Sequence, residues 1–178
     1  DDGEEFILMH ASNFRPVKRV LDICRIFYRV QKKIPARLVL LGKGPELGIV
    51  REFCSQMGMC HKIDIVGSRP DIENAMKQAH LFLLMSQYES FGLSALEALA
   101  CGTPVAASRA GGLPEVIEND VSGMLEPVGE VKDMAKRIIS VLRDREKWEQ
   151  MSRAAYDQSR KFTTESVVSR YEELYSNL

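Results

Sequence analysis

The chain has 178 residues, a length that suits one well-buried domain rather than two. Hydrophobic residues make up 45% and charged residues 28%, and the formal net charge of -1 provides no basic field for nucleic acid or an anionic membrane. No apolar run approaches the roughly 20 residues of a membrane span. The acidic start, DDGEEF, lacks the pattern of a signal peptide. We therefore expect one cytoplasmic domain over 1–178 that binds no nucleic acid.

In chain order, apolar runs that predict strands alternate with helical spacing of apolar residues. The expected elements are a strand at 6–11, a helix at 16–31, a strand at 37–42, a helix at 45–58, a strand at 62–67, a helix at 71–79, a strand at 80–86, a helix at 92–101, a strand at 104–108, a helix at 113–118 and a strand at 122–127. The rest, 129–178, is polar and helical, with breaks expected near 144 and 162. Six strands separated by helices predict a doubly wound, mostly parallel α/β sheet.

Such a sheet binds ligands outside the carboxyl ends of its strands. The loops at those ends carry glycine, serine or basic residues, and they are 12–19, 42–46, 67–71, 86–93 and 108–115. The first loop brings Arg15, Lys18 and Arg19 to the opening of a helix, which is either an anion site or an ordinary solvated helix start. In the fourth loop, Gly92 would let the backbone approach a ligand closely. The N–H groups around it could hold a phosphate without a metal, and they belong to Phe91, Gly92, Leu93 and Ser94.

Two glutamates flank this helix start, Glu89 in the loop and Glu97 about 7 Å along the helix from Gly92. They do not share a helix face, so a paired acid/base couple is disfavoured. Sugar and ribose hydroxyls are natural donors to such carboxylates. The alternatives are a solvated loop charge at Glu89, and helix-dipole compensation or a salt bridge at Glu97.

Other chemistry has no signature in the sequence. There is no D-x-D motif near a strand end, no P-loop, no G-x-G-x-x-G and no Ser/His/Asp order. The four cysteines form no C-x-x-C pair and are interpreted as reduced, packed thiols: Cys24, Cys54, Cys60 and Cys101. The three histidines are scattered without ligand spacing: His10, His61 and His80. We therefore predict no metal site.

The stretch ESFGLSALE resembles the E-x7-E signature of the retaining glycosyltransferases of family 4, which have the GT-B fold. LLGKGPE, the stretch from GSRPD to GGLPEVI, and NDVSGML follow in the order of that family. The resemblance covers essentially the whole chain. It implies one Rossmann-like half of a GT-B enzyme, the C-terminal half that binds the nucleotide-sugar donor. An acceptor-binding half would precede Asp1.

The resemblance also implies roles for individual residues. Glu97 would bind the ribose hydroxyls, Glu89 would face the donor sugar, and Lys18 would neutralise the leaving diphosphate. Arg69 would border the base, and Gly44 would let the nucleotide lie close. The implied catalytic residues are Lys18 and Glu89, and the implied donor-binding residues are Ser12, Asn13, Arg15, Gly44, Arg69, Ser90, Phe91, Gly92, Leu93, Ser94 and Glu97. Neither a metal nor another cofactor is implied.

The sequence departs from the family pattern at three positions. Asn13 stands where the diphosphate arginine is usual, with Arg15 close by as a substitute, and His80 and Met85 replace a usual aspartate and proline. HASNFRPVKRV resembles a branch in which asparagine is normal and which transfers N-acetylglucosamine from UDP-N-acetylglucosamine to L-malate, in bacillithiol synthesis. Three alternatives remain open: another acceptor (glycan, lipid or polysaccharide), a stand-alone nucleotide-sugar-binding module, and an epimerase of the same fold.

The last segment carries an apolar stripe: Phe162, Val167, Val168, Tyr171, Leu174 and Tyr175. It packs either on this domain or, as the family suggests, on the N-terminal half. An exposed stripe predicts self-association into a homo-oligomer.

Overall fold

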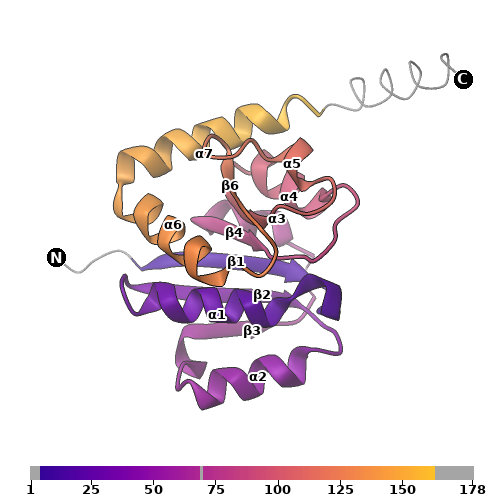
Figure 1. Cartoon of the computed structure of the whole chain (residues 1–178), viewed down its shortest axis with the longest axis vertical. Helices are drawn as coiled ribbons and strands as arrows, with labels where there is room; N and C mark the ends of the chain where they lie inside the picture. The colour runs from indigo at the N-terminus through magenta and orange to yellow at the C-terminus, as the bar shows by residue number, and fades with distance from the viewer. Residues whose placement is uncertain (1–4, 69, 163–178) are drawn as a thin grey trace, which may run out of the picture.

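A computed structural model describes residues 5–68 and 70–162, in which a six-stranded parallel sheet has helices on both faces (Figure 1). The sheet order is β3-β2-β1-β4-β5-β6. The strands are β1 (Phe6–Ser12), β2 (Ala36–Gly42), β3 (Ile63–Val66), β4 (Leu81–Leu84), β5 (Val105–Ser108) and β6 (Gly123–Glu126). The helices are α1 (Val20–Gln31), α2 (Leu47–Gln56), α3 (Ile72–Gln78), α4 (Leu93–Ala100), α5 (Leu113–Val116), α6 (Val131–Arg143) and α7 (Arg145–Ser159), with 3-10 turns η1 (Pro16–Lys18) and η2 (Cys60–Lys62). The predicted doubly wound sheet is confirmed, and every strand pair is parallel.

The sheet separates two apolar cores because alternate residues of a strand point to opposite faces. Leu8 of β1 belongs to the core under α1, α2 and α6, while the next residue, Met9, belongs to the core under α3, α4 and α5. β4 and β5 are buried along their whole length, as strands covered on both faces must be. The loops at the carboxyl edge therefore leave from strand ends that are packed on both faces.

The seam between β1 and β4 is where the strand order reverses. β1 pairs with β2 along its full length, from Phe6↔Ala36 to Ser12↔Gly42. It pairs with β4 only through Leu8↔Leu81 and Met9↔Phe82. Beyond Met9 the two strands part toward their carboxyl ends. This divergence makes the crevice in which sheets of this kind bind ligands.

The helix predicted at 16–31 is wrong at its start. Arg19 has a left-handed backbone (φ 48°), so α1 begins at Val20 and Lys18 ends the separate turn η1. The Arg19 side chain donates to the buried carboxylate of Asp22, with Nε 2.7 Å from Oδ2. The hydrogen bond anchors Arg19 to the first turn of α1. Lys18 is therefore held by a turn of its own rather than by the helix.

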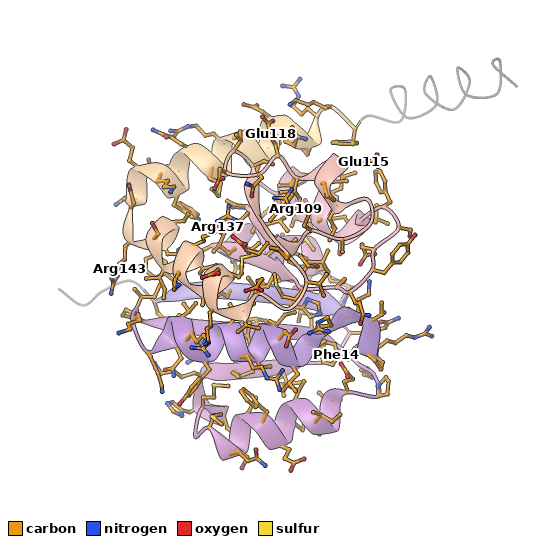
Figure 2. All side chains as sticks on the ribbon, viewed as in Figure 1. Phe14, Arg109, Glu115, Glu118, Arg137 and Arg143 are labelled. Carbon is orange, nitrogen blue, oxygen red and sulfur yellow. The ribbon has the colours of Figure 1, made fainter. Side chains whose placement is uncertain are left out.

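The final helices confirm the break predicted near 144. The Asp144 side chain accepts a hydrogen bond from the backbone N–H of Lys147 and so caps α7. Arg137 of α6 ties that helix back to β6, with 2.6 Å between its guanidinium and Glu126 Oε1 (Figure 2). The third predicted helix lies outside the described residues.

The apolar stripe can be followed only at its first residue. Phe162 is half-buried and packs edge-on against Phe91, with 6.1 Å between ring centroids. Its other members lie outside the described residues: Val167, Val168, Tyr171, Leu174 and Tyr175. In the part of the chain that the structure describes, no helix is long and apolar enough to cross a membrane.

The cysteine prediction holds for part of the set. Cys24 and Cys54 are buried, Cys101 is half-buried, and all four thiols are free. Cys60 is exposed, which contradicts its predicted packing. It opens the turn η2 before β3, where the chain crosses the surface.

Candidate active site

The loops that follow β1 and β4 are joined at the carboxyl edge of the sheet. The backbone N–H of Gln87 donates to the carbonyl of Val17 over 2.8 Å. This bond lies one residue before Lys18 and two residues before Glu89. It brings together two loops that are about 70 residues apart in the chain.

Lys18 and Glu89 form an ion pair at this junction. Lys18 Nζ lies 2.7 Å from Glu89 Oε2, and the two side chains are 20% and 15% exposed. The Ser86 hydroxyl donates to the same carboxylate oxygen over 3.1 Å. Ser108 at the end of β5 in turn donates to the Ser86 carbonyl. The site thus holds a cation and an anion in contact, supported by two strand ends.

Close backbone approaches shape the loop that carries Glu89. Gly112 donates its N–H to the Glu89 carbonyl over 2.8 Å. A Cβ on Gly111, which has a left-handed backbone (φ 53°), would lie 1.9 Å from that same carbonyl oxygen. The loop 108–115 therefore lies directly against the backbone of the loop 86–93. Only glycine at Gly111 permits this fit.

The structure shows a packing requirement for glycine at position 44 that could not be read from the sequence. A Cβ at this position would lie 1.8 Å from the Asn13 carbonyl oxygen. The loop after β2 thus packs on the loop after β1, and the residue is needed for contact within the protein. Its predicted closeness to a nucleotide stays a prediction.

Helix α4 begins at the centre of these loops. Its N-cap residue, Gly92, has a left-handed backbone (φ 86°), and no side chain caps the helix. The first N–H groups of an uncapped helix are available to an anion. Phe91 and Leu93 are 39% and 62% exposed, so apolar side chains flank this helix start.

Glu97 lies apart from the Lys18–Glu89 pair. It is exposed and borders a cavity of about 240 Å³ at the carboxyl ends of β1 and β2. The cavity is lined by Ala11, Ser12, Leu41, Gly42, Ser68, Ile72, Met76, Ser94 and Glu97. Glu89 is absent from this lining. The two glutamates therefore occupy separate surroundings, as their spacing predicted.

The remaining predicted residues divide between this region and the open surface. Ser12 and Ser94 line the cavity, whereas Asn13, Arg15 and Ser90 are exposed on the adjoining loops. Arg69 lies outside the described residues.

His10 is a residue that the sequence reasoning missed. Its side chain is completely buried, with Nδ1 2.8 Å from the Leu83 carbonyl and Nε2 2.7 Å from the Ser12 hydroxyl. The pKa of the imidazole is lowered from 6.5 to about 4, mainly by burial and to a smaller extent by the charge of Lys18. The hydrogen bond to Leu83 and the charge of Glu89 act in the opposite direction. A histidine inside an apolar strand was the available signal, because a buried polar side chain needs partners.

His80 lies at the other end of the β1–β4 seam. Its Nδ1 accepts the backbone N–H of Ile7 over 3.0 Å, and its ring packs against Phe6 and Trp148. Within residues 5–68 and 70–162, no group of three or more His, Cys, Asp or Glu side chains is arranged to hold a metal ion.

A parallel sheet in the order β3-β2-β1-β4-β5-β6, with its polar loops at the switch point, defines the Rossmann-like class of α/β domains. Residues 1–158 match the family described as glycosyl transferases group 1, and the chain belongs to that family. It is 37% identical over 172 residues to N-acetyl-alpha-D-glucosaminyl L-malate synthase of Bacillus anthracis, covering 96% of this chain and 45% of the relative. It is 39% identical over 187 residues to D-inositol 3-phosphate glycosyltransferase of Saccharomonospora viridis, covering 96% and 43%. The chain thus spans less than half the length of these relatives.

Solved structures share the fold. HepE of Anabaena, in complex with UDP and glucose, superposes with a TM-score of 0.86 at 26% identity, over 98% of this chain and 49% of HepE. The C-terminal domain of a group 1 glycosyl transferase of Francisella tularensis superposes with a TM-score of 0.78 at 23% identity, over 88% of this chain and 84% of that one. The predicted Rossmann-like architecture is confirmed.

Proposed function

We propose that this chain is the donor-binding half of a retaining glycosyltransferase of family 4. Its donor is UDP-N-acetylglucosamine, and the acceptor of the complete enzyme is L-malate. The malate synthase of Bacillus anthracis supports the N-acetylglucosaminyl group and the L-malate acceptor by its name, and HepE supports a UDP-sugar by its bound UDP and glucose. The acceptor-binding half precedes this chain in the complete protein.

One observation carries the proposal, the position of Lys18 beside the loop that leads into the uncapped start of α4. Lys18 reaches Glu89, and α4 begins four residues later at Leu93. A diphosphate placed there receives a cation on one side and backbone N–H groups on the other. These groups neutralise its charge without a metal ion.

The cavity bordered by Glu97 supports a single nucleoside. Its volume of about 240 Å³ lies slightly below the ~300 Å³ at which ligand pockets begin, which suits one base and ribose better than a dinucleotide. The Glu97 carboxylate accepts hydrogen bonds from ribose hydroxyls. Apolar side chains of Leu41, Ile72 and Met76 cover the rest of the nucleoside.

The chemical step then depends on electrostatic stabilisation. As the sugar–phosphate bond breaks, negative charge grows on the diphosphate, where Lys18 and the N–H groups of α4 stabilise it. The Glu89 carboxylate accepts hydrogen bonds from the sugar hydroxyls and so orients the sugar ring. Its negative charge also offsets the positive charge that develops on the sugar. The acceptor attacks from the side of the missing half. The exposed side chains of Tyr88, Phe91 and Leu93 lie next to Glu89, on the loop and the first residue of α4.

Calorimetry with UDP-N-acetylglucosamine tests this proposal. Lys18→Ala and Glu97→Ala should each weaken binding by roughly tenfold to a hundredfold. The matched controls are Lys136→Ala and Glu149→Ala, which remove exposed ion-pairing residues from α6 and α7 and should leave the affinity unchanged. Wild-type affinity retained in both Lys18→Ala and Glu97→Ala would overturn the site.

A second acceptor deserves a direct comparison because the Saccharomonospora viridis relative is named for D-inositol 3-phosphate. A full-length protein that contains this chain should be assayed with both acceptors. We expect a malate product with an unchanged anomeric configuration. Product formation with the inositol phosphate alone would reject malate, and an inverted product would reject the retaining mechanism. UDP-sugar binding by a full-length protein that has no transferase activity with any acceptor would favour a binding module instead.

A further inference from the structure

The backbone pairing of β1 and β4 ends just before His10, and from there the His10 side chain joins the two strands. The last ladder pair is Met9↔Phe82, and the next residues, His10 and Leu83, are joined by a side chain. The imidazole is stacked with the rings of Phe14 and Phe82, at centroid distances of 6.1 and 6.2 Å. One buried histidine thus links the end of β4 to the loop after β1.

The partners of the ring determine its tautomer. A carbonyl oxygen only accepts hydrogen bonds, so Nδ1 carries the proton that it donates to Leu83. Nε2 is then an acceptor, and the Ser12 hydroxyl donates to it. The Ser12 oxygen accepts the backbone N–H of Phe14 over 3.1 Å. The chain of hydrogen bonds runs in one direction and needs a neutral imidazole.

This chain ends at a strained residue. Phe14 is completely buried and has a left-handed backbone (φ 44°), which is rare for an aromatic residue (Figure 2). Its N–H is fixed by Ser12, its ring lies against His10, and its carbonyl accepts the N–H of Glu46. Strain of this kind persists only where the surroundings over-determine it. His10 and Ser12 are part of those surroundings.

The turn η1 follows directly and carries Lys18. The Lys18 N–H donates to the Arg15 carbonyl, and the Val17 carbonyl accepts from Gln87. The direction in which the chain leaves Phe14 therefore sets where η1 meets the loop 86–93. Lys18 and Glu89 are also the charged groups that act on the pKa of the His10 ring.

We propose that His10 is a positioning residue that, through Ser12 and Phe14, holds η1 so that Lys18 faces the start of α4. This inference rests on the proposed donor site, because the phosphate-binding role of Lys18 belongs to it. His10 does not touch the donor. Its effect on donor affinity passes through Lys18.

A double-mutant cycle on the 178-residue chain tests the inference. His10→Asn keeps a donor toward Leu83 and loses the acceptor for Ser12, and it should weaken UDP-N-acetylglucosamine binding roughly tenfold in calorimetry. In a Lys18→Ala background the same change should have an effect of less than about twofold, since coupled residues are not additive. A merely structural loss would lower affinity equally in both backgrounds.

Two further comparisons keep the test independent of folding. Ser12→Ala should weaken binding in the wild-type background and should have an effect of less than about twofold in the Lys18→Ala background, whereas loss of a direct contact in the cavity would weaken binding equally in both. The matched control is His80→Asn at the other end of the same seam. It should lower the unfolding temperature and leave the affinity unchanged.

The outcomes separate the two proposals. If wild-type protein does not bind the nucleotide sugar, or Lys18→Ala binds it as well as wild type, the proposed function fails. If Lys18→Ala weakens binding while a folded His10→Asn and Ser12→Ala do not, the inference about His10 fails and the donor site stands. Additive effects of His10→Asn and Lys18→Ala also overturn the inference.

Discussion

Lys18 Nζ and Glu89 Oε2 are in direct contact at 2.7 Å, although the residues are 71 positions apart in the chain. The family resemblance implied separate roles for them, one toward the diphosphate and one toward the sugar. Their contact makes the roles competitive, because a phosphate and the Glu89 carboxylate seek the same ammonium group. Under the proposed function, donor binding would therefore include an exchange of partners by Lys18.

Glu89→Gln tests that competition. The amide keeps a partner for Ser86 but holds Lys18 less tightly, so we expect UDP alone to bind a few-fold more strongly. Turnover by a full-length enzyme should fall about a hundredfold, because the carboxylate no longer offsets charge on the sugar. Calorimetry and product assays measure the two effects. Glu149→Gln, which alters an exposed pair on α7, is the control, and weaker UDP binding by Glu89→Gln would argue against competition.

The position of the loops could be predicted from the sequence, but their mutual contacts could not. Apolar runs such as LFLLM identify central strands, and parallel strands place all their following loops at one edge. The left-handed backbone of Arg19, which separates Lys18 from α1, leaves no trace in the apolar periodicity. The ion pair with Glu89 depends on contacts between loops that are distant in sequence.

The glycines show the same limit. The family resemblance implies that Gly44 lets a nucleotide lie close, which stays a prediction, and the structure adds that the Asn13 carbonyl lies where a Cβ would be. A glycine in a loop indicates that another group approaches the backbone closely, but the sequence does not reveal which group it is. The same holds for His10, whose partners come from β4 and from the loop after β1.

The thiols should differ in reactivity with Ellman's reagent. Cys60 is exposed and should react first. A hydrogen bond to Cys54, together with burial, raises the pKa of the Cys24 thiol, and burial raises the pKa of Cys101. The hydrogen bond from Cys24 lowers the pKa of Cys54, but its burial blocks the reagent. Cys60→Ser should remove the fast phase, and a fast phase that survives would contradict the exposure order.

Gly111→Ala should destabilise the fold by about 2–4 kcal/mol. The added Cβ would lie 1.9 Å from the Glu89 carbonyl oxygen on a left-handed backbone, so the loop 86–93 must move. Gly48→Ala in α2 is the matched control, because nothing lies within 4 Å of its Cβ and alanine favours a helix by up to about 1 kcal/mol. Urea unfolding compares the two free energies. Equal stability of Gly111→Ala and wild type would refute the close packing of the two loops.

Lowering the pH should destabilise the folded chain, because His10 is held neutral in it. Its pKa falls from 6.5 to about 4 in the folded chain, so the unfolded state binds the proton first as the pH drops. The contribution of a neutral His10 to the free energy of unfolding is complete above pH 6.5 and is lost progressively toward pH 4. This lowering of the His10 pKa corresponds to at most about 3 kcal/mol of the free energy of unfolding.

Urea unfolding at a series of pH values measures this loss. Wild-type stability should decline between pH 6.5 and pH 4 with a slope of up to about 1.4 kcal/mol per pH unit from this group. His10→Asn has no imidazole at this position to bind a proton, so its slope should be shallower than that of wild type. His80→Asn provides the matched comparison at the far end of the seam. An identical slope in wild type and His10→Asn would show that His10 does not cause the difference in proton binding between the unfolded and folded states.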